Sequence, residues 1–151
     1  MLYQFLSVLN KVMPAKPVYA HCDIPCGIYK AEPMKTAAET VVKMAELITN
    51  PPLVFDTNSP DSVRNYHNAM TRYVLVKEEH AQECKKQVLI LWTDFFKPEH
   101  LELFPDLHEK VWNITKLCSQ NKQKVSVELA KELQKEVQEF AEIFEKAKAV
   151  K

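Results

Sequence analysis

Glycine is almost absent from this chain of 151 residues, which contains a single glycine but nine prolines. Average usage would place roughly ten glycines in a chain of this length. Because glycine weakens helix interiors, a helical protein can do without it, whereas a β-rich protein needs it in many tight turns. The scarcity of glycine therefore favours an all-α fold, and it directs attention to Gly27, the one residue that adopts positive φ freely.

An excess of either charge is also lacking. Twenty Lys and Arg residues balance twenty Asp and Glu residues, and the isoelectric point is about 7.0. This balance offers no electrostatic reason to expect nucleic acid or an anionic membrane as a partner. No apolar run approaches the roughly 20 residues that span a bilayer. We expect one soluble domain with a real core.

Four stretches carry apolar residues at the three- and four-residue steps of amphipathic helices. These stretches cover residues 34–48, 63–95, 104–118 and 125–147. Ser59 and Pro60 suit the start of the second helix, which we expect to end near Pro98. We expect a turn at residues 119–121. Since no strand pattern competes, the sequence predicts an antiparallel four-helix bundle.

Residues 1–20 precede these patterns and have the features of a short leader. Val18-Tyr19-Ala20 resembles a signal-peptidase site, which leaves secretion open as an alternative. However, the apolar stretch before it is short, and no lysine or arginine precedes that stretch. We therefore favour a removable cytoplasmic propeptide at 1–20, followed by a single domain at 21–151.

Two closely spaced cysteines, Cys22 and Cys26, lie just after this leader. Three residues separate them, so the spacing differs from the two-residue spacing of thioredoxin-like motifs. No second close pair completes a four-cysteine zinc site. The other two cysteines, Cys84 and Cys118, lie on the apolar stripes of separate helices, where we expect small buried core residues.

Cleavage between Ala20 and His21 would turn this segment into a chelating terminus. The freed α-amine of His21 and the amide nitrogen and thiolate of Cys22 would form adjacent five-membered rings around one ion. Pro25 would help turn the chain, so that Cys26 brings a second thiolate. The His21 imidazole is close enough to serve as an axial ligand.

This set of two nitrogens and two sulfurs restricts the choice of metal. A planar site suits Ni(II) or Cu(II), whereas zinc prefers a tetrahedron. The anionic donors would also stabilise a higher oxidation state and bring a Ni(III)/Ni(II) couple into reach. Two other functions stay open: a nickel- or copper-binding chaperone, which would use the same donors, and a thiol redox protein that uses Cys22 and Cys26.

The segment from His21 to Tyr29 closely resembles the His-Cys-x-x-Pro-Cys-x-x-Tyr hook of the nickel superoxide dismutases. A second resemblance covers residues 91–98, Leu-Trp-Thr-Asp-Phe-Phe-Lys-Pro, where the family has Leu-Trp-Ser-Asp-Tyr-Phe-Lys-Pro. Residues 104–108 are also similar to the family. The likeness extends over most of residues 21–118 and includes the last helix.

The resemblance implies an enzyme that disproportionates superoxide to dioxygen and hydrogen peroxide by Ni(III)/Ni(II) cycling, in antioxidant defence. It implies one nickel ion per subunit, held by His21, Cys22 and Cys26. Tyr29 would gate the open face of the metal, and Asp23 would help to hold Tyr29 and the loop. It also implies a cytoplasmic homohexamer and a peptidase that removes the propeptide.

The chain departs from the family at two positions. Some members support the axial imidazole with a Glu–Arg pair, and the corresponding positions here are Ala37 and His80. We expect either that His80 itself supports His21 or that it is a surface histidine of the second helix. We expect His67, His100 and His108 to be surface or capping residues.

Overall fold

The computed structural model describes residues 27–149, and every regular element within that range is helical. The leader and hook residues 1–26 lie outside the described residues. The elements are α2 (Glu32–Thr49), α3 (Pro60–Ile90), the π-helical turn η1 (Leu91–Phe95), α4 (Pro98–Leu103), α5 (Leu107–Gln123) and α6 (Val127–Ala149). No helix in the described part is long and apolar enough to cross a membrane.

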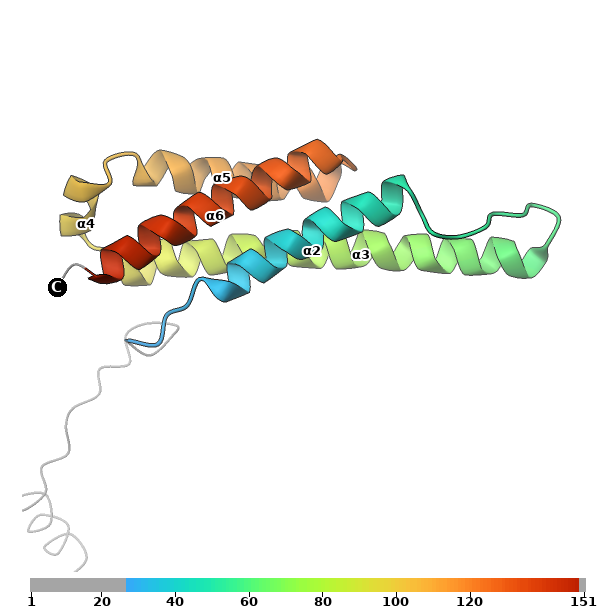
Figure 1. Cartoon of the computed structure of the whole chain (residues 1–151), viewed down its shortest axis with the longest axis horizontal. Coiled ribbons are helices and arrows are strands. Elements are labelled where there is room, and N and C mark those ends of the chain that lie inside the picture. Colours follow the sequence, from blue (N-terminus) through green and yellow to red (C-terminus); the bar gives the residue numbers. More distant parts are fainter. Residues whose placement is uncertain (1–26, 150–151) are drawn as a thin grey trace, which may run out of the picture.

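The four long helices form one bundle. Helix α2 packs against α3 and α6, and α5 packs against the same two helices, so the four close a ring around the core. Figure 1 shows α2 and α3 as a hairpin beside the hairpin of α5 and α6. The all-α fold and the helical bundle predicted from the sequence are confirmed.

The helix starts follow from local chemistry. Ser59 caps α3, because its Oγ accepts a hydrogen bond from the Ser62 amide at 3.3 Å, and Pro60 occupies the first turn, as predicted. Helix α2 has Pro33 in its first turn, and it ends at Asn50 just before two prolines.

Residue size determines how the core is filled. On α2, Ala37, Ala38 and Ala45 are each at most 2% exposed, so this helix presents small side chains to its neighbours. On α6, which packs against α2, Phe140 and Phe144 are fully buried and supply bulk. Small side chains on one helix beside large ones on its neighbour allow the two helices to pack closely.

The turn predicted at residues 119–121 is wrong, because α5 continues through these residues to Gln123. Asn121 is 1% exposed, and its Nδ2 donates to the carbonyl oxygens of Leu117 at 2.9 Å and Leu129 at 3.1 Å. A side chain that resembles a turn signal therefore joins α5 to α6. The connection is made by the three residues 124–126.

The end of the second helix also differs from the prediction. Helix α3 passes at Leu91 into η1, and a separate short helix, α4, follows before α5. The amide of Lys97 donates to Nδ1 of His100 at 3.0 Å, which caps the start of α4. The capping role expected for His100 is confirmed, but this histidine is buried rather than on the surface.

Candidate metal centre

The chain joins the bundle through Gly27, the first residue that the structure describes. Its φ of +92° lies in the region that L side chains rarely adopt, although a Cβ would meet no atom within 4 Å. Backbone conformation, not space, therefore requires glycine at this position. The single glycine of the chain sets the direction in which residues 28–31 approach α2.

Tyr29 is fixed against the bundle. Its side chain is 6% exposed, and its ring contacts the ring of Phe95 edge-on, with centroids 5.8 Å apart. Aromatic pairs in this geometry contribute about 0.5–1.5 kcal/mol beyond the burial of their surface. The structure thus places the last residue of the predicted hook firmly in an aromatic cluster.

This aromatic cluster is assembled from η1, α4 and α6. Phe95 stacks on His100 with centroids 5.6 Å apart and packs edge-on against Phe144 at 4.7 Å. Phe96 packs against Phe140 at 5.6 Å. The π-helical turn ends with Phe95, and Phe96 follows it in extended backbone, so the break in α3 positions the surface that receives Tyr29.

Sequence reasoning missed Phe95 as a partner of Tyr29. A signal was present, since Phe95 occupies the place of the tyrosine in the family segment that residues 91–98 resemble. The contact between Tyr29 and Phe95 is non-local, and helical periodicity alone assigns Phe95 only to an apolar stripe.

His80 is not brought close to Tyr29. It is half-buried on α3, and its Nδ1 lies 2.9 Å from the carbonyl oxygen of Val76 one turn earlier. Phe95, which contacts Tyr29, is fifteen residues further on, or roughly 20 Å along the helix axis. Ala37 is buried in the core on α2.

The remaining histidines have partners of their own. His108 is exposed, and its Nδ1 accepts a hydrogen bond from Nε1 of Trp92 at 3.0 Å. His67 is exposed and packs edge-on against Phe55. Both lie on the surface, as expected.

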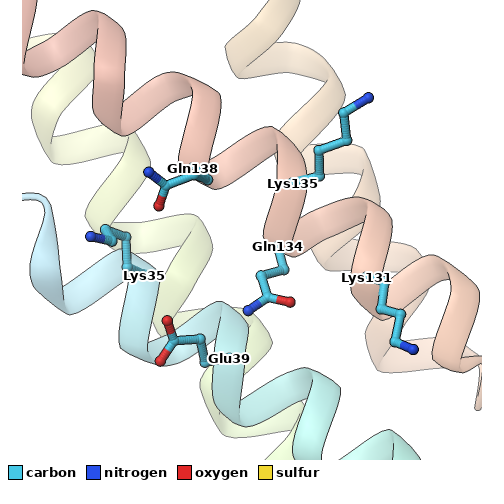
Figure 2. A pocket seen from close by; sticks show the side chains of 6 residues that line it. All are labelled: Lys35, Glu39, Lys131, Gln134, Lys135 and Gln138. Atoms are coloured by element: carbon cyan, nitrogen blue, oxygen red, sulfur yellow. The ribbon is translucent and has the colours of Figure 1, made fainter.

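Residues 27–149 contain no group of three or more His, Cys, Asp or Glu side chains that could hold a metal ion. A polar hollow lies between α2 and α6 (Figure 2), but lysine and glutamine side chains with the single carboxylate of Glu39 line it. The predicted donors His21, Cys22 and Cys26 and their neighbours Asp23 and Pro25 lie outside the described residues. Two thiolates, an amine and an amide are the donor set suited to a planar nickel site.

The fold and the path of residues 27–31 define a class of protein. It is a small helical bundle in which the segment before the first helix leads onto an aromatic cluster. Comparison with known proteins specifies the family. The sequence model of the nickel-containing superoxide dismutases matches residues 16–148. The chain therefore belongs to this family, and it is a nickel-dependent superoxide dismutase.

Individual members of the family are similar to this chain in sequence and in fold. A superoxide dismutase [Ni] of Streptomyces coelicolor is 34% identical over 106 residues, which cover 70% of this chain and 71% of the relative. One of Streptomyces seoulensis is 34% identical over 107 residues, with the same coverage. The native nickel superoxide dismutase structure at 1.30 Å is similar with a TM-score of 0.68 and 29% identity, over 85% of this chain and 99% of that one.

Proposed function

We propose that the nickel of this superoxide dismutase is held by the N-terminus created by cleavage between Ala20 and His21. The α-amine of His21, the amide nitrogen and thiolate of Cys22 and the thiolate of Cys26 would hold the ion, and the His21 imidazole would supply a further nitrogen. When bound there, nickel supplies a Ni(III)/Ni(II) couple that takes an electron from one superoxide and returns one to the next.

The buried position of Tyr29 is the observation that carries this proposal. Tyr29 is the third residue after Cys26, and an extended chain advances at most about 3.6 Å per residue. The Cα atom of Cys26, the last proposed ligand, must therefore lie within about 11 Å of the Cα atom of the anchored Tyr29. At that range, Tyr29 can order water and restrict which small anions approach.

The other hook residues have supporting roles in this account. Asp23 holds Tyr29 and the loop, and Pro25 restricts the backbone so that the two thiolates converge. The nickel-binding segment is too short to be ordered alone, so we infer that metal binding and ordering of the hook are coupled.

His80 acts, in this proposal, across a subunit boundary. Within one subunit it lies roughly 20 Å along α3 from the residue that contacts Tyr29. Because a carbonyl oxygen only accepts hydrogen bonds, the contact with Val76 assigns the proton to Nδ1 and leaves Nε2 as an acceptor. That acceptor could support the imidazole of His21 from a neighbouring subunit, in place of the family's Glu–Arg pair.

The proposal extends to maturation and assembly. Residues 1–20 are a propeptide that keeps the His21 nitrogen as an amide, and a dedicated peptidase removes it in the cytoplasm. Residues 21–151 then form the enzyme domain, which assembles as a homohexamer with each hook against a neighbouring subunit.

Substitution of single cysteines tests the donor set. In the chain that begins at His21, Cys22→Ser and Cys26→Ser should each abolish superoxide dismutation and the rhombic Ni(III) electron paramagnetic resonance signal. Cys84→Ala is the matched control, because Cys84 is buried in the bundle, and it should keep both. Full activity in either hook variant would overturn the assignment of the thiolates.

A further inference from the structure

Two cysteines outside the proposed hook lie together in the core. Cys84 on α3 and Cys118 on α5 are both 0% exposed and both carry free thiols. The dismutation chemistry does not use them. As small apolar residues they fill space, but a pair of thiols in contact has chemistry that a pair of alanines lacks.

The pairing of α3 with α5 brings these positions face to face. The two helices run antiparallel, and contacts between them bracket the cysteines: Lys77 Nζ donates to the Lys124 carbonyl at 3.1 Å on one side, and Trp92 donates to His108 on the other. Adjacent to the pair, Lys85 Nζ donates to Ser119 Oγ at 2.8 Å. The two cysteine side chains are close enough to each other for a hydrogen bond between their sulfurs.

The two sulfurs are not equivalent. The hydrogen bond with Cys84 lowers the pKa of Cys118 despite its burial, and the positive charges of Lys85 and Lys122 act in the same direction. The same hydrogen bond, together with burial, raises the pKa of Cys84. The positive charges of Lys85 and Lys122 near Cys118 favour this sulfur as the nucleophile of the pair.

We propose that Cys84 and Cys118 are an oxidation site for hydrogen peroxide, the product of this enzyme's own reaction, and that they close to a reversible disulfide between α3 and α5. The Cys118 thiolate attacks one oxygen of the peroxide and breaks the O–O bond, which gives a sulfenic acid and, after protonation, one water. The Cys84 sulfur then attacks the Cys118 sulfur, the S–O bond breaks, and hydroxide leaves to become the second water. Two thiols and one peroxide thus give one disulfide and two waters.

The location of the disulfide gives it a consequence for the site. The loop that it closes, residues 84–118, contains η1 and α4, which carry Phe95 and His100. Phe95 contacts the ring of Tyr29, and His100 stacks on Phe95. Oxidation would tie the two ends of this segment together and hold the aromatic cluster in place.

Access to the pair requires local opening, since neither sulfur reaches the surface. The hydrogen bonds of Lys85 with Ser119 and of Lys122 with Gln82 at 2.9 Å join α3 and α5 near the pair and must loosen first. Oxidation should therefore be slower than that of an exposed thiol. The disulfide should accumulate only under sustained exposure to peroxide.

Peptide mapping of the nickel-loaded enzyme tests the proposal. After treatment with hydrogen peroxide, free thiols are alkylated and the unreduced protein is digested with trypsin. Peptides 78–85 and 117–122 should be recovered as one linked species that dithiothreitol separates. The hook cysteines cannot mimic this species, because both fall in one peptide that ends at Lys30.

Two controls isolate the cause. Cys118→Ala should give no linked species, and it should also lose the rise in unfolding temperature, about 5 °C or more, that the crosslink gives the parent enzyme. When the enzyme is supplied with superoxide instead of peroxide, the linked species should accumulate, and added catalase should suppress it.

Two results would overturn the proposal. One is recovery of Cys84 and Cys118 as free thiols or as separate sulfinic acids under peroxide that oxidises the hook cysteines. The other is formation of the linked species to the same extent with and without catalase when the enzyme is supplied with superoxide. This result would exclude peroxide as the oxidant.

Discussion

At the scale of single residues, Tyr29 and His80 are the two residues of the bundle that we propose to act on the metal site. Tyr29 is held by burial and by the ring of Phe95. Nδ1 of His80 donates a hydrogen bond to the carbonyl oxygen of Val76 on the same helix, and Nε2 of the neutral ring can accept one. Two histidines could therefore share one hydrogen bond, with the proton on the ring of His21.

Replacement of His80 by alanine tests this role. His80→Ala should change the axial coordination of nickel and hence the electron paramagnetic resonance spectrum of the oxidised enzyme, because the imidazole of His21 loses its acceptor. His67→Ala, an exposed histidine on the same helix, is the matched control and should leave the spectrum as it was. An unaltered spectrum and rate in His80→Ala would make His80 a surface histidine only.

At the scale of elements, the C-terminus of α5 shows how the fold uses a charge inside the core. Lys77 on α3 is 1% exposed, and its Nζ donates to the carbonyl oxygens of Asn121, Lys122 and Lys124. The last carbonyls of a helix lack partners within it, and the helix dipole favours a cation there. Burial lowers the pKa of Lys77, but these three acceptors make its position at the helix end favourable.

Lys77→Met tests this cap, because it keeps the length of the side chain and removes the donor. The free energy of unfolding should fall by about 1–3 kcal/mol, since buried carbonyls lose their partner. Lys86→Met, at an exposed position of the same helix, should change it by less than about 0.5 kcal/mol. Chemical denaturation of both variants measures the difference, and equal stabilities would show that the cap contributes nothing.

The elements also show what the sequence can predict. The periodicity of apolar residues located the long helices, and Ser59 with Pro60 located the start of α3, because these signals act within one helix. Asn121 was misread as a turn residue, since its partners, including the carbonyl of Leu129, are supplied by tertiary packing. The π-helical turn and the ordering of Tyr29 on Phe95 likewise depend on contacts between distant segments.

At the scale of the whole molecule, the bundle leaves one end uncovered. Figure 1 shows the first half of α3 extending past the ends of α5 and α6, together with the loop after α2. That loop exposes Val54 by 87% and Phe55 by 48%, and Leu75 on α3 is 54% exposed. Large apolar side chains exposed at one end of a molecule are typical of an interaction site. We expect this end to contribute to the proposed hexamer.

A charge placed on the loop tests that expectation. Val54→Glu should shift the enzyme from hexamers to smaller species in analytical ultracentrifugation, because an interface would have to bury an unpaired carboxylate. Thr57→Glu, also exposed in this loop, is the matched control for charge. A hexamer of undiminished stability in Val54→Glu would place the interface elsewhere.

The length of the N-terminus tests the central claim most directly. The chain that begins at His21 should bind one nickel per subunit and remove superoxide rapidly, with a rhombic Ni(III) signal. The chain that keeps Ala20 has the same thiolates but an amide in place of the α-amine, so it should lose both the signal and at least most of the activity. If that one added residue left activity and spectrum intact, the α-amine of His21 would not be a ligand.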